Sequence, residues 1–177
     1  MLRRNPAYNR QLSGTAKQAA NRRAERIAYQ DAGRRLASRG EGCHVAGCML
    51  YWAEGEKDRN SLRFYNSDPE MVRFFVFFLK KYFDLRDEEI KITCNLFADY
   101  IQRQHEIEQF WLDVAQLSKH SLCKSYVNVY SRHSKKKRMN RLPYGTVRVT
   151  VCRTRVVQSI FGSIQEYAGF ERDAWLE

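Results

Sequence analysis

Apolar positions recur along this chain at two different spacings. Four stretches repeat them every three to four residues, the spacing of a helix face: 44–53, 70–84, 106–117 and 155–169. Four others alternate apolar with polar residues, as half-buried strands do: 62–66, 89–97, 126–130 and 146–153. The predicted order is helix, strand, helix, strand, helix, strand, strand, helix. It favours an α/β (α+β) fold whose mixed, mainly antiparallel sheet carries its helices on one face.

The second of these helices has a clear start signal. Asp68 is a capping residue, Pro69 suits the first helical position, and Glu70 places an acid in the first turn. The sequence that follows is apolar at most positions between Met71 and Leu79. We therefore expect this helix to be buried on most sides.

The beginning of the chain has a different composition. Residues 15–39 are rich in alanine, arginine and glutamine, and Gly14 and Gly40 flank them, which predicts a helix. Its apolar positions are mostly alanines, which are small anchors, so we expect a loosely docked arm. The chain is thus divided into a basic helical arm, residues 1–40, and a domain, residues 41–177.

Charge is distributed unevenly along the chain. The 177 residues carry a formal net charge of +11, and no acidic residue occurs between Val114 and Gln165. A mildly acidic middle separates this basic stretch from the basic arm. Such segregation favours a polyanionic partner, because basic surfaces bind phosphates with release of counterions. The alternative is a solvated basic face that serves solubility.

The five cysteines argue against a secreted, disulfide-rich protein. They are odd in number and lie mostly in apolar runs, which is typical of reduced thiols, and their spacing does not suit a zinc finger. No stretch has the length of a membrane span, so we expect no membrane partner. We expect a cytoplasmic protein, although the arginine-rich start also resembles an organellar transit peptide.

One carboxylate stands out as a candidate for chemistry. Glu54 closes an apolar helix and Gly55 follows it, so the chain can turn and leave the acid exposed to a groove. Paired carboxylates at a helix end can hold a divalent cation for phosphodiester hydrolysis. The alternative is structural: Glu54 ends the helix and pairs with Lys57 or Arg59.

The hexapeptide Leu50-Tyr51-Trp52-Ala53-Glu54-Gly55 resembles the second half of the motif of LAGLIDADG homing endonucleases. The order of elements over residues 43–170 and the segment from Phe64 to Phe75 are similar to that family as well. The resemblance implies a LAGLIDADG-like fold. The outward-facing Arg148, Thr150 and Arg153 of the late strands predict that the open sheet face is basic. Three departures are visible. Glu54 replaces the usual aspartate, and Met49 replaces an early glycine. The family's basic residue near the scissile phosphate has no single counterpart, since Lys135, Lys136 and Arg153 could each serve.

The resemblance also implies roles for individual residues. Glu54 and Gly55 would form the metal site, for Mg²⁺ or another divalent cation, and Asn66 would be the active-site amide that positions water. Single-motif members of the family are homodimers, so a small-residue helix face would form the interface between copies. Its residues are Ala46, Gly47, Leu50 and Ala53.

These observations predict site-specific binding of double-stranded DNA, with metal-dependent cleavage by a homodimer and no small-molecule cofactor. One alternative is a catalytically silent DNA-binding regulator on the same scaffold, and a weaker one is an RNA-binding or intron-splicing factor. The predicted DNA-binding residues lie on the open face and in the polar loop 131–144, whose basic segment 132–141 we call the basic loop. They are Arg63, Asn128, Arg132, Lys135, Lys136, Lys137, Arg138, Arg141, Arg148 and Arg153.

Overall fold

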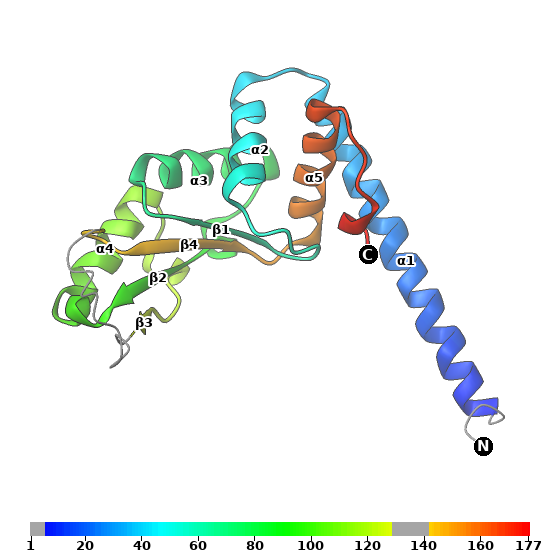
Figure 1. The fold of residues 1–177 in the computed structure, drawn as a ribbon, viewed down its shortest axis with the longest axis horizontal. Helices are drawn as coiled ribbons and strands as arrows, with labels where there is room; N and C mark the ends of the chain where they lie inside the picture. Colours follow the sequence, from blue (N-terminus) through cyan, green and yellow to red (C-terminus); the bar gives the residue numbers. More distant parts are fainter. Residues whose placement is uncertain (1–5, 129–141) are drawn as a thin grey trace, which may run out of the picture.

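The computed structural model describes residues 6–128 and 142–177 (Figure 1). Its helices are α1 (Pro6–Ala37), α2 (Gly42–Glu54), α3 (Pro69–Phe83), α4 (Gln104–Ala115) and α5 (Thr154–Ala168). Its strands are β1 (Leu62–Asn66), β2 (Lys91–Phe97), β3 (Tyr126–Asn128) and β4 (Thr146–Val151). The order of elements predicted from residue 43 onward is confirmed.

The four strands form one mixed sheet in the order β1-β4-β2-β3. β4 pairs antiparallel with both β1 and β2, whereas β3 pairs parallel with β2. An isolated antiparallel bridge joins Gly55 to Phe64, so the residue after α2 lies beside β1. The sheet with its helices is consistent with the predicted α+β class.

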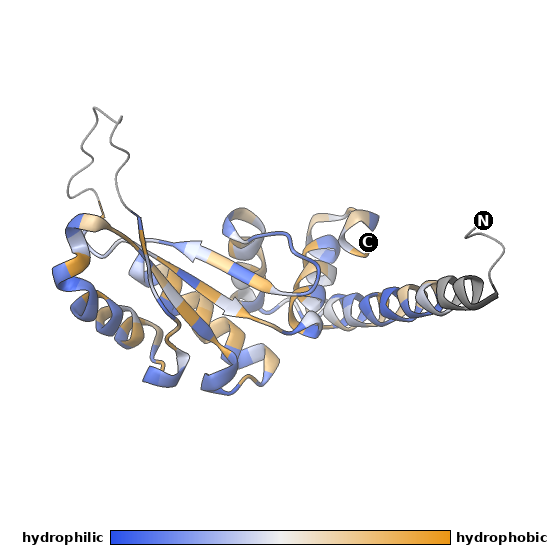
Figure 2. Cartoon of the chain, turned by 90° about the horizontal axis from the view of Figure 1, so that it is seen from below, coloured by the Kyte–Doolittle hydropathy of each residue, from blue (hydrophilic) through white to orange (hydrophobic). Residues whose placement is uncertain are grey.

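The core lies between one face of the sheet and the helices that cover it. Phe64, Val149 and Ile92 stand in one cross-strand row and are fully buried. Phe75 of α3 and Trp111 of α4 are buried in the same cluster. Figure 2 shows the alternation of hydrophobic and hydrophilic residues along the strands that this packing requires.

Helix α3 begins as predicted but is less buried than predicted. The Asp68 side chain accepts hydrogen bonds from the backbone N–H groups of Glu70 (2.8 Å) and Met71 (3.3 Å). Phe75 and Phe78 are fully buried, yet Phe77 is 53% exposed and Met71 is 41% exposed. The expectation of burial on most sides was wrong, because neighbouring elements cover only part of the circumference of α3.

The second half of α1 docks tightly on α5. A Cβ atom on Gly33 would come within 1.9 Å of the Ser159 carbonyl oxygen, and one on Gly162 within 2.0 Å of the Gln30 carbonyl oxygen. The expectation of a loosely docked arm is therefore wrong for this half. Small residues permit a close backbone approach rather than a weak contact. The first half of α1 extends away from the domain (Figure 1).

Buried amides hold the same two helices together. The Gln30 side chain donates to Gln158 Oε1 (2.8 Å) and accepts from Gln165 Nε2 (2.9 Å). All three side chains are almost inaccessible to solvent, so each bond satisfies a group that would be costly to bury alone.

No helix within residues 6–128 and 142–177 has the length and apolar character to cross a membrane.

Acid is expected to destabilise the fold through His44. The imidazole is 1% exposed and its Nδ1 lies 2.6 Å from the Tyr167 hydroxyl, with Tyr82 and Cys48 against the ring. Burial lowers the pKa of His44, while Glu41 raises it and Arg39 lowers it. Because the unfolded imidazole takes up its proton at a higher pH than the folded one, the free energy of unfolding falls as the pH drops below about 6.5.

This dependence is measurable by melting the protein between pH 8 and pH 5. One group contributes at most about 1.4 kcal/mol per pH unit. The variant His44→Gln, which keeps a polar side chain but does not titrate, is expected to have a flatter profile between pH 6.5 and pH 5. Parallel profiles for the two proteins would show that His44 does not cause the effect.

Candidate nucleic-acid interface

The face of the sheet opposite the core is polar, and we call it the open face. Strand alternation turns every second residue toward it, so its composition follows from the sequence once the register is known. The residues are Arg63, Tyr65, Lys91, Thr93, Asn95, Phe97, Tyr126, Asn128, Thr146, Arg148 and Thr150. Tyr65 and Tyr126 are 39% and 55% exposed, so their rings are accessible to a ligand.

Arg148 occupies the centre of the open face. The register places it between Tyr65 of β1 and Thr93 of β2. Its guanidinium carbon lies 5.9 Å from the ring centroid of Tyr65 and 5.6 Å from that of Tyr126, and its Nη2 donates to Thr93 Oγ1 (3.3 Å). Cation–π contacts with two rings from different strands hold the side chain in one orientation.

Two polar atoms at this point lack a partner. Within the described residues, Arg148 Nε and Thr150 Oγ1 are buried and form no hydrogen bond. Contact with Tyr65 raises the pKa of Arg148; burial opposes this shift, and contact with Tyr126 adds to it. A buried donor and a buried acceptor without partners beside a fixed cation are suited to a polar, anionic ligand.

Three other predicted DNA-binding residues lie within the described part of the chain. Arg63 faces the open side but forms ion pairs with Glu56 (3.2 Å) and Asp58 (3.8 Å), and Asn128 is exposed on β3. Arg153 lies beyond the end of β4 and pairs with Glu89. The structure therefore brings Arg63, Asn128 and Arg148 onto one face and leaves Arg153 outside it.

The basic loop lies outside the described residues. The predictions that fall there concern Arg132, Lys135, Lys136, Lys137, Arg138 and Arg141. Their contribution to binding stays a prediction.

The end of α2 presents one exposed carboxylate, that of Glu54. The Lys57 ammonium group beside it donates to the carbonyl oxygens of Tyr51 (3.3 Å) and Gly55. Burial lowers the pKa of Lys57, with a further contribution from Arg172, and Glu54 opposes the shift. The Gly55 carbonyl oxygen, the predicted metal ligand, thus already accepts a hydrogen bond from a cationic side chain.

Beside Glu54, the described part of one chain offers few further ligands for a divalent cation. Mg²⁺ prefers six oxygen ligands, commonly including one or two carboxylates. Nowhere in the described part of the chain do three histidine, cysteine, aspartate or glutamate side chains gather around a possible metal position. The predicted metal site at Glu54 and Gly55 therefore depends on a second copy of the chain and stays a prediction.

Asn66, the predicted active-site amide, has a structural role at the end of β1. Its Oδ1 accepts from the N–H groups of Ser67 and Asp68, both at 2.8 Å, and its Nδ2 contacts Met71 Sδ at 3.3 Å. These bonds shape the turn into α3. The positioning of water by this amide stays a prediction.

The predicted interface on α2 is only partly available at the surface. Ala46 and Ala53 are exposed and Leu50 is half-buried. Gly47 instead faces Phe78 of α3, whose ring atoms lie 2.3 Å from where a Cβ would be. We therefore correct the assignment of Gly47, which packs within its own chain.

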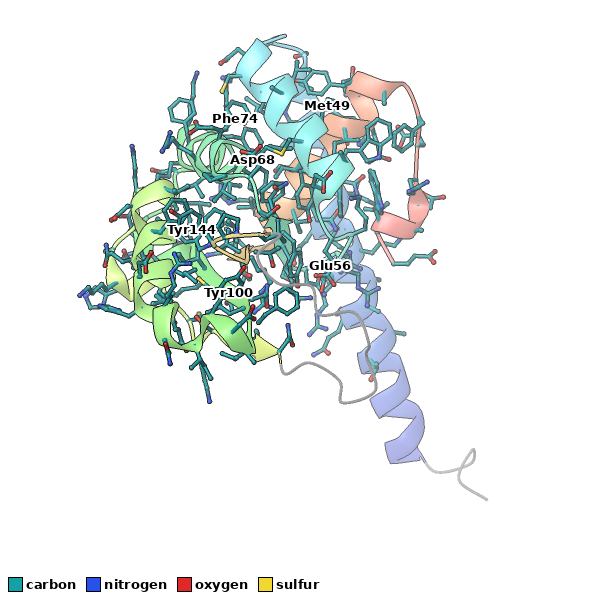
Figure 3. The ribbon with its side chains drawn as sticks, turned by 60° about the vertical axis from the view of Figure 1, so that its left-hand side comes forward. Met49, Glu56, Asp68, Phe74, Tyr100 and Tyr144 are labelled. Carbon is teal, nitrogen blue, oxygen red and sulfur yellow. The ribbon has the colours of Figure 1, made fainter. Side chains whose placement is uncertain are left out.

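Met49 of α2 and Phe74 of α3 lie on the helical side of the molecule (Figure 3).

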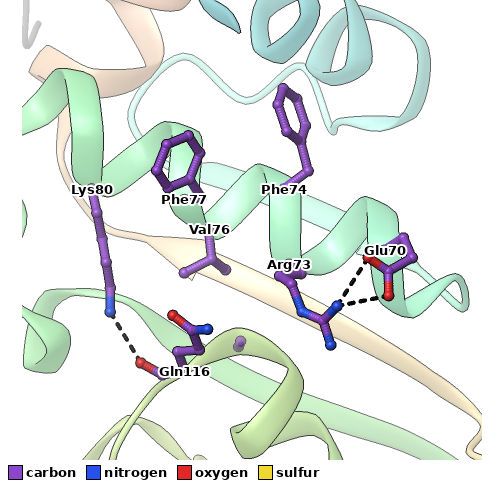
Figure 4. Close-up of a pocket in the computed structure, with 8 residues that line it drawn as sticks. Glu70, Arg73, Phe74, Val76, Phe77, Lys80 and Gln116 are labelled. Carbon is purple, nitrogen blue, oxygen red and sulfur yellow. Dashed lines mark hydrogen bonds and ion pairs between the residues drawn. The ribbon is translucent and has the colours of Figure 1, made fainter.

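A separate groove lies on the helical side, between α3 and the end of α4 (Figure 4). It has a volume of about 340 Å³. Lys80 Nζ donates to the Gln116 carbonyl oxygen across it (3.1 Å), and Arg73 pairs with Glu70 at its rim (2.8 Å). Because α3 and α4 cover the apolar face of the sheet, this groove is not part of the open face.

Two residues of the open face were missed at the sequence level. Tyr65 and Tyr126 flank Arg148. Tyr144, in contrast, packs on Phe110 with ring centroids 3.7 Å apart. The alternation in β1, which turns Tyr65 away from buried Phe64, was the signal that could have identified it.

Comparison of the chain with protein-family models, curated proteins and solved structures finds no match.

Proposed function

We propose that this protein binds double-stranded DNA through the open face of its sheet. The observation that carries the proposal is the fixed guanidinium of Arg148, held between Tyr65 and Tyr126 beside the unpartnered hydroxyl of Thr150. An arginine fork in a fixed orientation is suited to the O6 and N7 atoms of guanine in the major groove. Sheets and ribbons of strands are among the elements that read that groove.

The charge of the chain supports the same proposal. The net charge of +11 favours a polyanion, and the acid-free stretch from Val114 to Gln165 includes β3, β4 and the basic loop. The open face would supply polar groups for base contacts, and the basic residues of the loop, which lie outside the described part of the chain, would supply cations for phosphates. Phosphate contacts would set the position, and Arg148 would discriminate between bases.

Cleavage of the DNA is a second candidate function. The observation that favours it is the exposed carboxylate of Glu54 at the end of α2, one residue before the bridge that joins Gly55 to β1. The described residues of one chain bring no three carboxylate, histidine or cysteine side chains together, so this candidate relies on a homodimer that pairs two Glu54 side chains. Exposed Ala46 and Ala53, with half-buried Leu50, would form the contact. A silent regulator needs no such pairing.

The experiment that tests both candidates uses fluorescence anisotropy and a cleavage assay on the same samples. Random-sequence duplex DNA, the corresponding single strand and a structured RNA are titrated at equal salt, with and without Mg²⁺. We expect the duplex to bind most tightly and the affinity to fall steeply with salt. Tighter binding of the RNA or the single strand would overturn the duplex proposal in favour of base stacking on Tyr65 and Tyr126.

The variant Glu54→Gln decides the catalytic candidate. If two glutamates hold a metal ion, Mg²⁺-dependent cuts in a duplex library should fall by at least about 100-fold while binding is retained. The matched control is Glu56→Gln, the neighbouring exposed acid that pairs with Arg63. Binding without cuts in the unaltered protein would leave the regulator as the function of this scaffold.

A further inference from the structure

A polar pocket lies in the corner between α1, the turn before β1 and the start of α5. It has a volume of about 420 Å³. Its lining residues are Ala19, Arg22, Glu25, Arg26, Arg59, Asn60 and Thr154. We call it the corner pocket. It is formed by three segments that are far apart in the sequence, so it exists only because α1 docks on α5.

Positive charge in the corner pocket is not balanced. Three guanidinium groups, those of Arg22, Arg26 and Arg59, line it together with one carboxylate, that of Glu25. None of the three arginines has a salt bridge in the part of the chain that the structure describes. Burial lowers the pKa of Arg26, and the charges of Arg59 and Arg22 lower it further, which reflects repulsion between like charges.

The most buried of these arginines is fixed in place. Arg26 is 8% exposed, and its Nε donates to the carbonyl oxygen of Leu176 at 2.7 Å. This bond uses one of the five guanidinium donors and leaves the terminal amino groups for the pocket. A positioned fork beside two more arginines is suited to the oxygens of a phosphate group.

The start of α5 adds donors at the same place. Thr154 is the first residue of this 15-residue helix, and the preceding Arg153 makes no side-chain capping bond. The first N–H groups of the helix therefore lack a capping side chain. The Val156 N–H bonds to the Arg153 carbonyl oxygen (3.0 Å), and the positive end of the helix dipole favours an anion at this position. Thr154 also lines the pocket, so the helix end and the arginines converge on one space.

We propose that the corner pocket binds a phosphate group, and that in the complex this phosphate belongs to the backbone of the DNA that lies on the open face. The second part rests on the proposed function. Arg59 and Asn60 lead into β1, and Thr154 follows the end of β4, so the pocket adjoins the end of the open face. Helix α1 runs past this corner (Figure 1). DNA crossing the sheet would reach the pocket with its backbone.

The first part is tested without DNA. Inorganic phosphate is titrated into the full chain by calorimetry at constant ionic strength, with chloride as the competing salt. The double variant R22Q/R59Q is expected to bind phosphate at least about tenfold more weakly, because charged hydrogen bonds are lost. The matched control is R35Q/R39Q, which removes two exposed arginines from the other end of the same helix region. Equal phosphate affinities for R22Q/R59Q and R35Q/R39Q would overturn the proposal that the corner pocket binds phosphate.

The second part is tested by the salt dependence of duplex binding. The slope of log K against log salt concentration should fall by about 1 in R22Q/R59Q, as for the loss of one phosphate contact, and stay unchanged in the control. The variant R22K/R59K, which keeps the charges but not the forks, should retain most of the slope.

The outcomes separate the pocket from the proposed function. If R22Q/R59Q binds phosphate more weakly but keeps the salt slope of duplex binding, the phosphate in the pocket does not come from the DNA backbone. The corner pocket would then be a site for free phosphate. If the unaltered chain does not bind duplex at all, the proposed function fails, while the calorimetric result still decides the pocket. The complete proposal is supported if R22Q/R59Q shows both weaker phosphate binding and a smaller salt slope while R35Q/R39Q shows neither.

Discussion

Replacing Arg148 by alanine is expected to weaken duplex DNA binding by about 10- to 100-fold, the effect of losing one bidentate base contact. The guanidinium is already fixed by Tyr65, Tyr126 and Thr93, so little conformational entropy is lost when it binds. Anisotropy titrations of the variant at fixed salt measure the loss. Binding should also become less dependent on sequence, since the remaining contacts are mostly with phosphates.

Two further variants show whether the fork or the charge is responsible. Arg148→Lys keeps the charge but not the planar fork. The affinity for random-sequence duplex should therefore fall only slightly, whereas the preference for one duplex sequence over another should be largely lost. Arg73→Ala removes a cation from the helical side of the molecule, where it pairs with Glu70, and should bind like the unaltered protein. If Arg148→Ala and Arg73→Ala bind equally, the open face is not the DNA-binding surface.

Replacing Gly33 by alanine is expected to destabilise the protein by about 3 kcal/mol, the cost of overpacking a close contact. The new Cβ would lie 1.9 Å from the carbonyl oxygen of Ser159, so α1 and α5 would have to separate. That movement would also stretch the buried bonds between Gln30 and its partners on α5. For a chain of this size the melting temperature should fall by about 6 to 12 °C.

The matched control makes the same substitution at another glycine of α1, where the expected effect on stability has the opposite sign. Gly14 has no atom within 4 Å of the position of a Cβ, so Gly14→Ala adds helix propensity without a clash. It should raise stability by about 0.5 to 1 kcal/mol or leave it unchanged. Similar melting temperatures for the two variants would contradict the close docking of α1 on α5.

The elements of the fold could be predicted from the sequence because their signals are local. The alternation in β4 identifies Arg148 as pointing away from Val147 and Val149, and Asp68 and Pro69 identify the start of α3. The grouping of Tyr65, Arg148 and Tyr126 depends instead on strand order. It requires β4 to lie between β1 and β2, with β3 parallel to β2 at the edge, and nothing local specifies that arrangement.

Helix contacts were the harder part of the prediction for the same reason. The alanines of α1 suggested weak anchoring, yet Gly33 marks a close approach to α5, because a small residue fits either a loose or a very tight contact. Gly47 on α2 was likewise assigned to another copy of the chain, but it accommodates Phe78. The sequence indicates where backbones can approach each other, and only the fold identifies the partner.

The docking of α1 on α5 has a consequence for the order of events during synthesis. Gln30 bonds to Gln158 and Gln165, which follow it by 128 and 135 residues, and Arg26 bonds to Leu176, 150 residues later. The ribosome therefore releases α1 long before its docking partner has been made. Until residues 158–176 have been synthesised, this cationic helix lacks the partners that it contacts in the fold, so the corner pocket forms only after α5 has been made.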